Sequence, residues 1–471
     1  MMKPLTVIRN LLRCRRGGVA VAMSLAIVPV GVAAGIGVDV GRGYLEKERL
    51  SKALDAATLA AGSTQGTDAQ LQARFQKYFN ANYGSGANSG AAVQSVSLAI
   101  NHATNVLTGT ATVKVDTTFM RLGSFNDLTI AATSEITRQT TGLELALVLD
   151  NTGSMLANNN IQAVRDSSKQ IVEQLFGNNT ANPNLKVSIV PYSASVNVGS
   201  IAPTIVTGSG ATYDPNDSSK WKGCVSERNY PDDIQDTPPT TGRMWTRYWW
   251  PSDKNASMPS GKVPDNAWTP ITTIFNDPNT CNNSTGPNLA CPTPITPLTN
   301  DKTTLVNALN AMQAWCRGGT IGHVGMAWGW RTLSPNGPFT EGLAYNTPNW
   351  RKAAILMTDG DNLIYSKANS KWKSDYTAFG RLDDNRLGTT DKTVAKGILN
   401  TRLSEVCANM KAAGITIYTI TFTSNIDAAT KAIYRNCASD LDKYFDAPSQ
   451  ATLASAFNFI GTELSSLRVS K

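Results

Sequence analysis

Histidine is almost absent from this chain, which has only His102 and His323 among its 471 residues. Hydrolase triads and histidine-based metal centres both depend on imidazole, so this scarcity argues against them. The sequence also lacks a Cys-x-x-Cys pair, which argues against a structural zinc site. No nucleophile–base pair and no paired catalytic carboxylates stand out, so an enzyme would have to use a bound metal ion itself. The enzymatic interpretation is therefore the weakest, and we expect both histidines to be ordinary polar residues.

Most of the chain also lacks an excess of basic charge. The formal net charge is +8, but five basic residues lie in the first sixteen positions, where no acidic residue occurs. The remaining chain holds 38 basic and 35 acidic residues and shows no basic stripe with interleaved aromatic residues. Nucleic-acid binding would need such a stripe. The charge instead marks the amino terminus, through Lys3, Arg9, Arg13, Arg15 and Arg16.

An uncharged segment from Val19 to Val38 follows these basic residues, and its 20 residues are just enough to cross a bilayer as a helix. A cleaved signal peptide usually has a shorter apolar core, and a buried core helix would not explain arginines on one side only. The one-sided basic flank predicts a cytoplasmic amino terminus and a chain that lies outside the cytoplasm after Gly41. We expect a basic cytoplasmic tail at residues 1–16 and a transmembrane helix at residues 17–41.

Cysteine usage agrees with export. Cys14 lies on the predicted cytoplasmic side, and six cysteines follow the apolar segment: Cys224, Cys281, Cys291, Cys316, Cys407 and Cys437. An even number in an exported region is what disulfides require, although six cysteines allow fifteen pairings. We expect Cys407 to pair with Cys437, and the other four to pair among themselves.

Residues 42–140 form a membrane-proximal segment with two kinds of pattern. Gly43 to Gly62 and Asp68 to Phe79 have apolar residues on one helical face, and the first of these helices continues from the membrane span or packs beside it. A Gly- and Asn-rich loop, Gly84 to Gly90, separates them from the Val- and Thr-rich stretch Val93 to Thr137. That stretch predicts a small antiparallel sheet. A helix followed by a small sheet is a pilin-like plan, by analogy of fold only.

From residue 141 to 471, strand and helix patterns alternate, which indicates an α/β domain with an open, doubly wound, mostly parallel sheet. The expected strands are Leu143–Leu149, Lys186–Tyr192, Ala353–Thr358, Thr416–Phe422 and Lys443–Phe445. The expected helices are Asn159–Phe176, Lys302–Cys316, Ile321–Leu333, Lys392–Ala413 and Ala451–Leu467.

Two insertions interrupt this domain, at residues 208–300 and 361–390. The first carries three cysteines and half of the ten tryptophans. Its Arg247-Tyr248-Trp249-Trp250 run suits an aromatic platform for a sugar or a protein, but a small satellite core of buried tryptophans is the interpretation we favour. In the second insertion, Asp361 follows a strand closely enough to be an indirect contact of any ion bound there, or to have no role.

One segment carries the most functional information. An apolar strand ends in Asp150, and Thr152 and Ser154 follow around Gly153. A carboxylate, two hydroxyls and a glycine at the end of a strand suit a hard cation, because they supply oxygen ligands and a tight turn. The segments Gly318-Gly319-Thr320 and Ala353 to Gly360, which contains Asp359, complete such a site. The alternative is that Asp150 and Asp359 only cap strand-to-helix turns.

These three segments resemble the metal-ion-dependent adhesion site of von Willebrand factor type A domains, whose pattern is Asp-x-Ser-x-Ser, a threonine and an aspartate. The matching residues are Asp150, Thr152, Ser154, Thr320 and Asp359, with Thr152 where serine is commoner. The resemblance implies that these side chains hold the ion, and that a carboxylate of a partner protein occupies its open position. It therefore implies binding without a chemical step. So few protein oxygens suit Mg2+ or Mn2+ better than Ca2+.

The amino-terminal part carries a second resemblance. Arg15–Val21, Gly37–Tyr44 and Leu54–Ala61 are similar to the TadE/G-like start of TadG-type Flp pilus-assembly proteins, which place such an anchor ahead of a type A domain. The resemblance implies a single-pass protein of the bacterial inner membrane whose periplasmic part binds pilus-assembly or pilin components. Related TadE-type pseudopilins are cut after a glycine. Met23 stands where the peptidase's substrates carry glutamate, so we expect the anchor to stay attached.

A second hypothesis is an envelope adhesin that uses the tryptophan-rich insertion as its contact surface and has no role in pilus assembly.

Overall fold

The computed structural model describes residues 18–64, 68–84, 91–101, 106–137, 141–207, 212–217, 219–268 and 286–467. The predicted basic tail lies outside these residues. So do Cys14, His102, Cys281 and residues 85–90 of the predicted loop. The chain divides between Thr140 and Thr141 into two compact units, called unit 1 and unit 2.

Unit 1 begins with one continuous helix, α2 (Gly18–Gly62). The helix predicted at Gly43 to Gly62 therefore continues from the apolar segment. Among the described residues, α2 is the one helix long and apolar enough to cross a membrane. From residue 22 to 34 its side chains are exposed, and a buried stripe then begins with Gly35, Asp39, Gly43, Glu46 and Leu50. This spacing of three or four residues is the repeat of one helical face.

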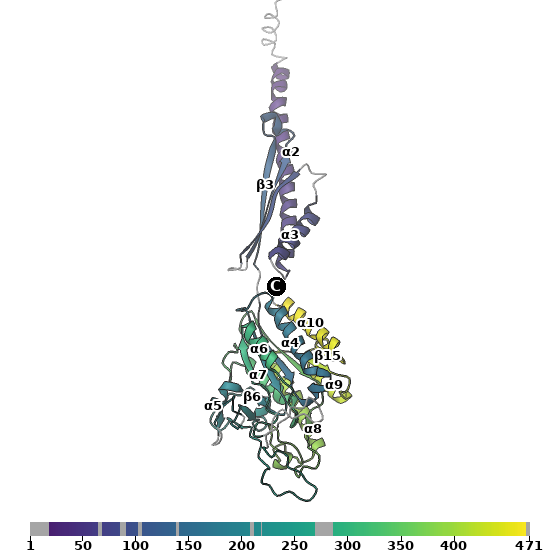
Figure 1. Ribbon diagram of the computed structural model, residues 1–471. Helices are drawn as coiled ribbons and strands as arrows, with labels where there is room; N and C mark the ends of the chain where they lie inside the picture. The colour runs from purple at the N-terminus through teal and green to yellow at the C-terminus, as the bar shows by residue number, and fades with distance from the viewer. Residues whose placement is uncertain are drawn as a thin grey trace, which may run out of the picture. The chain divides into compact units, whose positions relative to one another are not determined.

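The rest of unit 1 packs on that stripe. Helix α3 (Asp68–Tyr83) runs four residues beyond its predicted end, and Phe79 and Tyr83 stack in the core. Strands β1 (Ala91–Asn101), β2 (Val106–Asp116) and β3 (Asp127–Thr137) form an antiparallel sheet, as predicted. Figure 1 shows β3 running along α2. The core of unit 1 joins α2, α3 and the sheet through residues such as Leu54, Phe75 and Val113.

Unit 2 is built on one mixed sheet with the order β15-β14-β12-β4-β5-β6-β8-β9-β7, to which β10 pairs beside β5. The five strands from β15 to β5 are mutually parallel, as the alternating pattern predicted. The bounds of the parallel strands are β4 (Gly142–Asp150), β5 (Leu185–Tyr192), β12 (Trp350–Thr358), β14 (Thr416–Phe422) and β15 (Tyr444–Ala447). The shorter strands are β6 (Val196–Asn197), β7 (Val206–Thr207), β8 (Cys224–Ser226), β9 (Trp245–Arg247), β10 (Thr296–Thr299), β11 (Gly319–Thr320) and β13 (Leu363–Ile364).

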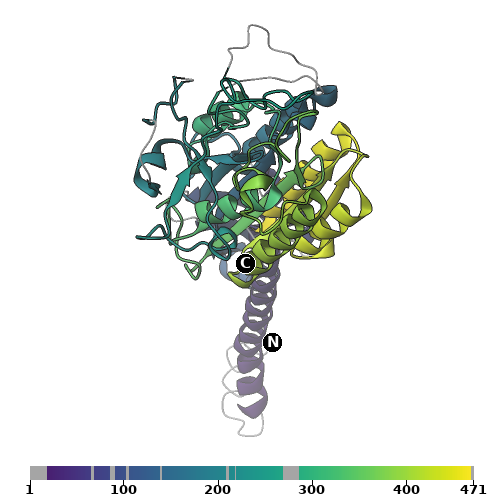
Figure 2. The same cartoon turned by 90° about the horizontal axis from the view of Figure 1, so that it is seen from below.

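Helices cover both faces of this sheet. The helices of unit 2 are α4 (Asn160–Phe176), α5 (Ala202–Ile205), α6 (Lys302–Ala311), α7 (Gly322–Leu333), α8 (Lys392–Ala412), α9 (Ala428–Cys437) and α10 (Gln450–Leu467). Alternate residues of β4 enter different cores, because successive side chains of a strand point to opposite faces. Ala146 and Val148 meet α7 and α8, whereas Leu145, Leu147 and Leu149 meet α4, α6 and α10. Figure 2 shows the C-terminal elements, in yellow, together at one side of unit 2.

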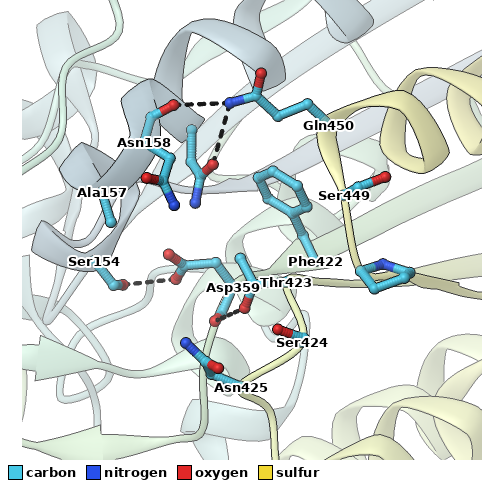
Figure 3. Close-up of a pocket in the computed structure, with 12 residues that line it drawn as sticks. Ser154, Ala157, Asn158, Asp359, Phe422, Thr423, Ser424, Asn425, Ser449 and Gln450 are labelled. Carbon is cyan, nitrogen blue, oxygen red and sulfur yellow. Dashed lines mark hydrogen bonds between the residues drawn. The ribbon is translucent and has the colours of Figure 1, made fainter.

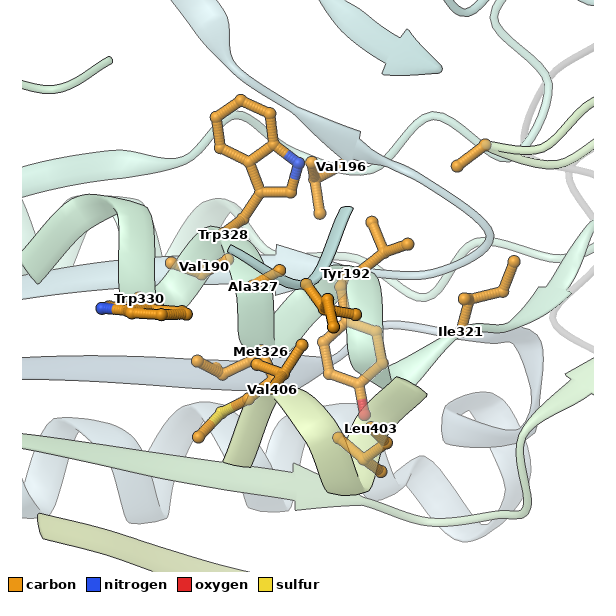
Figure 4. Close-up of a cluster of buried hydrophobic side chains, with 14 of the residues drawn as sticks. Val190, Tyr192, Val196, Ile321, Met326, Ala327, Trp328, Trp330, Leu403 and Val406 are labelled. Carbon is orange, nitrogen blue, oxygen red and sulfur yellow. The ribbon is translucent and has the colours of Figure 1, made fainter. Parts of the chain in front are cut away.

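Helix α7 lies against the centre of the sheet. Figure 4 shows its Met326, Trp328 and Trp330 packed with Val190 and Tyr192 of β5. Every residue of α7 is buried. Such close approach needs small residues, and an added Cβ at Gly329 would lie 2.4 Å from the Val148 side chain.

One predicted helix has the wrong end, and one helix of the structure was not expected. The helix predicted to reach Cys316 ends at Ala311, since the following backbone binds another loop instead: Gln313 O accepts from the Asn151 side chain, and Trp315 N donates to Asn151 O. Helix α9 is not among the expected helices; it has ten residues, of which only Thr430, Tyr434 and Cys437 are buried. It begins after Asp427, whose side chain accepts from Thr430 N.

The tryptophan-rich insertion is part of the fold. Its strands β8 and β9 extend the main sheet, and Cys224 is bonded to Cys291. Trp221 and Trp245 enter the main core, whereas Trp250 lies in a separate cluster with Tyr248 and the disulfide. The favoured satellite core therefore exists, but it holds only part of the tryptophans.

The disulfide predicted between Cys407 and Cys437 is confirmed, and it ties α8 to α9. Cys316 is also disulfide-bonded. His323 is fully buried, and its ring stacks on that of Phe379.

Gly329→Ala is expected to destabilise unit 2 by about 1–3 kcal/mol, because the added methyl group overlaps Val148 in a closely packed core. All ten tryptophans lie between residues 221 and 372, so tryptophan fluorescence during urea unfolding of the full chain reports on unit 2 alone. Gly397→Ala in α8 is the matched control, since no atom lies within 4 Å of its added Cβ. It should stabilise by roughly 0.5–1 kcal/mol. Equal effects of both variants would contradict this packing.

Candidate metal centre

The first loop of the predicted site begins where β4 ends. Asp150 Oδ1 accepts hydrogen bonds from Thr152 N at 2.8 Å and from Thr152 Oγ1 at 2.6 Å. Thr152 Oγ1 lies 3.0 Å from Ser154 Oγ. Gly153 makes this turn possible, because an added Cβ would lie 2.6 Å from Cys316 Sγ. The turn thus collects one carboxylate and two hydroxyls at one edge of the sheet.

The third loop meets the first because β12 is the parallel neighbour of β4, with Met357 opposite Leu149. Asp359 therefore follows its strand at the same edge as Asp150. Ser154 Oγ donates to Asp359 Oδ1 at 2.6 Å, and Thr358 Oγ1 donates to Asp150 Oδ2 at 2.9 Å. The structure brings together four of the five predicted side chains in one chain of hydrogen bonds: Asp150, Thr152, Ser154 and Asp359.

Thr320 is placed by a separate pairing. It lies in β11, which pairs with β13 of the segment after Asp359, with Thr320 opposite Leu363. Thr320 is buried, and the described hydrogen bonds do not link it to the four other residues. Its two preceding glycines are required by close contacts and positive φ angles: an added Cβ at Gly319, where φ is 125°, would lie 1.9 Å from Leu363 O.

Arg317, next to the second loop, forms ion pairs with an aspartate of each insertion. Its guanidinium donates to Asp375 of the second insertion at 2.6 and 2.7 Å, and it also pairs with Asp265 of the first. Asp375 Oδ2 accepts from Gly318 N at 2.9 Å. All three charged groups lie in the interior or close to it. The insertions therefore support the loop that carries Thr320.

The two carboxylates of the site are withdrawn from solvent. Asp150 is fully buried, and burial raises the pKa of its carboxyl above the usual range. Burial and the neighbouring charge of Asp150 raise the pKa of Asp359 well above its usual range. Raised pKa values mean that the ionised pair opposes folding unless a positive charge compensates it. Hydrogen bonds from the hydroxyls of Thr152, Ser154 and Thr358 partly stabilise the ionised carboxylates, but these hydroxyls carry no positive charge.

The donor set fits a small divalent cation. Oxygen ligands about 2.1 Å from Mg2+ and at right angles to one another lie about 3 Å apart. The neighbouring oxygens of Asp150, Thr152, Ser154 and Asp359 lie 2.6–3.0 Å apart. Among the described residues, no group of three or more His, Cys, Asp or Glu side chains could hold a metal ion. A site here would depend on hydroxyl oxygens beside two carboxylates.

An open cleft of about 710 Å³ leads to this site, and Figure 3 shows Ser154 and Asp359 on its wall. The remaining lining consists of residues that the sequence did not single out, namely Ala157, Asn158, Asn160, Phe422, Thr423, Ser424, Asn425, Pro448, Ser449 and Gln450. The polar run that directly follows β14 was a usable sequence indication. Gln450 Nε2 donates to Asn158 O at 2.8 Å, so the start of α10 is bound to the first loop.

The structure also shows the contacts of two further residues near the site, Tyr192 and Asp361. Tyr192 lies behind Asp150, with its hydroxyl 3.5 Å from Asp150 Oδ2 and 3.0 Å from Met357 O. Asp361, considered as an indirect contact of the ion, pairs instead with Lys396 of α8 at 2.8 Å.

Comparison with known proteins gives two kinds of match. Residues 17–65 match the family described as "Putative Flp pilus-assembly TadE/G-like". No curated protein sequence matches the chain. The fold is similar to that of the vWF domain of the type V pili tip protein Mfa5 from Porphyromonas gingivalis, at 11% identity, a TM-score of 0.36, and coverage of 70% of this chain and 97% of that chain.

Two other solved structures are similar over a smaller share of their own length. The pilus adhesin RrgA from Streptococcus pneumoniae has 10% identity and a TM-score of 0.37, with 79% of this chain and 48% of that chain covered. Proximal thread matrix protein 1 from the mussel byssus, in a form with a zinc-occupied MIDAS motif, has 13% identity and a TM-score of 0.32, with 69% and 48% covered. The chain thus spans about half of these two proteins. A TadE/G-like amino-terminal segment precedes an α/β domain with a mostly parallel sheet in this chain, as the sequence indicated.

In EDTA, Asp359→Asn is expected to raise the free energy of unfolding of unit 2 by on the order of 1 kcal/mol. The amide keeps an oxygen for the Ser154 hydroxyl but removes the buried charge beside Asp150. Urea unfolding of the full chain, followed by tryptophan fluorescence, measures the change. Asp442→Asn, at a carboxylate whose side chain is 71% exposed, should have no effect. A clear loss of stability in Asp359→Asn would instead support a role as a loop cap.

Proposed function

We propose that this protein is anchored in the bacterial inner membrane by α2 and binds a partner protein through a divalent metal ion held by unit 2. We further propose that this binding serves the assembly or anchoring of a Flp-type pilus. The protein then acts by binding and carries out no chemical step. The observation that carries the proposal is the convergence of Asp150, Thr152, Ser154 and Asp359 on the wall of an open cleft.

The charge at this site is the first argument for a metal. Two buried carboxylates face each other through hydroxyl groups, and the described ion pairs give neither of them a cationic partner. Mg2+ or Mn2+ would be held by these carboxylate and hydroxyl oxygens, with Thr320 as a further candidate from the second loop. Bound there, the ion would supply the missing positive charge and an acceptor position for an anionic group.

The exposure of the site is the argument for a partner. Asp359 is 6% exposed and reaches the cleft, whereas Asp150 lies beneath it with no exposure. A small ion that keeps open positions can take a carboxylate from outside. Asn, Ser, Thr and Gln side chains line much of the remaining wall and offer hydrogen bonds to a polypeptide. The cleft therefore suits an acidic side chain presented by another protein.

The amino-terminal segment supports the proposed location in the inner membrane. Helix α2 has an exposed apolar surface over residues 22–34, and the TadE/G-like match begins just before it. The basic residues that precede the helix favour a cytoplasmic amino terminus. Everything after the span would then lie in the periplasm.

The adhesin hypothesis is weakened by the burial of the insertion's aromatic residues. Trp245, Tyr248 and Trp250 are fully buried, so they offer no platform. Trp249 and Trp268 are only partly buried, and their rings meet edge to face at 5.6 Å. Deleting the insertion would remove β8 and β9 from the sheet. Substitution of this ring pair is therefore the appropriate test of the hypothesis.

Millimolar Mg2+ or Mn2+ is expected to raise the unfolding midpoint of unit 2 in the detergent-solubilised full chain, relative to EDTA. An ion at a hundred times its dissociation constant contributes about 2.7 kcal/mol. Tryptophan fluorescence during heating measures the shift. Asp150→Ala should abolish the shift while unit 2 stays folded, and Asp442→Ala should keep it. The absence of a shift with every divalent metal would refute the metal site.

In cells, Asp150→Ala is expected to reduce Flp-type pili strongly, while the variant stays in the membrane at the native amount. Electron microscopy counts the pili, immunoblots of membranes measure the protein, and Asp442→Ala is the matched control. Normal pili with Asp150→Ala would contradict a role of the metal site in assembly. Normal pili together with lost surface attachment in a Trp249→Ala, Trp268→Ala double variant would favour the adhesin hypothesis.

A further inference from the structure

The turn between β2 and β3 lies against the apolar part of α2. An added Cβ at Gly35 would lie 2.5 Å from the Phe119 ring, so the ring fills the space that this glycine leaves. One helical turn further on, both carboxylate oxygens of Asp39 accept hydrogen bonds from the backbone of the turn. Arg42 also donates to Thr118 Oγ1 at 3.1 Å. The turn is therefore held beside α2 at the level of Gly35 to Arg42.

That level overlaps the predicted membrane span. The uncharged segment ends at Val38, and Gly35 lies three residues before that end, or about 4.5 Å along the helix axis. A helix that crosses the bilayer through this segment must place the neighbouring turn at the outer surface of the membrane. Phe119 would lie slightly below that surface.

The turn presents apolar side chains to its surroundings. Leu122 is 77% exposed, Phe125 is 64% exposed and Phe119 is 40% exposed. Three large apolar side chains on one short turn form a patch that would be unfavourable in water. The core of unit 1, by contrast, packs its apolar side chains between α2, α3 and the sheet.

The backbone of the turn is suited to an apolar environment, where unpaired amides are costly. The amides of Thr118, Phe119 and Met120 donate to Asp39 at 2.7–3.1 Å. Four more amides of the turn donate to carbonyl groups within it, namely those of Thr117, Leu122, Ser124 and Phe125. Asp39 is only 2% exposed, so its charge is covered by these donors.

The surrounding charges limit how far the turn enters. Asp116 and Asp127 are opposite each other at the ends of β2 and β3, and both are exposed. Arg121 within the turn is exposed as well, and its long side chain can reach the headgroups while the apolar residues go deeper. This distribution of charged and apolar side chains suits a shallow contact of the turn with lipid.

We propose that the β2–β3 turn, residues 117–126, dips into the outer leaflet of the membrane beside α2 and forms a second contact with the lipid. Phe119, Leu122 and Phe125 are the inserted residues. This inference rests on the proposed membrane anchoring by α2, and it adds a contact that fixes unit 1 against the lipid surface.

The experiment measures lipid contact residue by residue in the full chain. A Cys14→Ser background receives single cysteines, which are labelled with an environment-sensitive fluorophore and reconstituted in vesicles of phosphatidylethanolamine and phosphatidylglycerol. Leu122→Cys and Phe125→Cys test the turn, Val30→Cys in the apolar part of α2 reports the span, and Leu59→Cys is the water reference. Leu59 is 60% exposed on α2, 24 residues beyond Gly35. The background protein without an introduced cysteine measures labelling elsewhere.

Labels at Leu122 and Phe125 are expected to be quenched by lipid-attached doxyl groups at least about twofold more strongly than the label at Leu59, since interfacial apolar residues enter the headgroup boundary. Doxyl groups near the headgroup should quench them more than deep ones. Strong quenching at Val30 with quenching at Leu122 and Phe125 equal to that at Leu59 would overturn the turn's insertion and leave the anchor standing. No quenching at Val30 would overturn both.

A glycine pair provides an independent check. Gly35→Ala places a methyl group against the Phe119 ring, whereas nothing lies within 4 Å of an added Cβ at Gly31. Gly35→Ala should lower the quenching of the Leu122 label, and Gly31→Ala should leave it unchanged. Equal quenching in both variants would contradict the placement of the turn by Gly35.

Discussion

Two buried carboxylates at the ends of neighbouring parallel strands are the constraint on which unit 2 depends. The parallel register of β4 and β12 places Asp150 and Asp359 at the same edge, and their loops must then turn within a few ångströms of each other. Like charges withdrawn from water repel strongly. The hydroxyls of Thr152, Ser154 and Thr358 lessen that repulsion, and a divalent cation would remove it. The fold thus holds two carboxylates in an arrangement that a bound cation would stabilise.

Much of the remaining structure serves to hold these loops. Segment 312–316 leaves α6 early and binds the first loop through Asn151, and Cys316 packs on Gly153. Arg317 joins the second loop to aspartates of both insertions. Trp250 of the suggested binding platform is instead buried, and the guanidinium carbon of Arg317 lies 5.2 Å from the centre of its ring. Both insertions therefore contact the loop that carries Thr320, and the first of them holds a disulfide and several buried aromatic residues.

In unit 1, glycines of α2 allow neighbouring segments to approach the helix closely. Gly35 and Gly43 let the turn and β3 approach α2 closely, and the side chains that fill the space are Phe119 and Leu128. Asp39 then accepts hydrogen bonds from the backbone of the turn, so a carboxylate holds a turn with exposed apolar side chains against α2. A carboxylate so near an apolar segment is tolerable because backbone donors surround it.

The sequence by itself determined the elements whose pattern is local. The parallel strands, most of the helices and the antiparallel sheet followed from periodicity. The Cys407–Cys437 bond agreed with the pairing expected of exported cysteines. The three loop motifs selected Asp150, Thr152, Ser154, Thr320 and Asp359. The end of α6, the burial of Trp245 and Trp250, the lining of the cleft and the contact of Phe119 with Gly35 were decided only by the tertiary structure. Each of these depends on a contact between residues far apart in the chain, and such a contact can override a helical pattern or bury a surface without leaving any periodic trace in the local sequence.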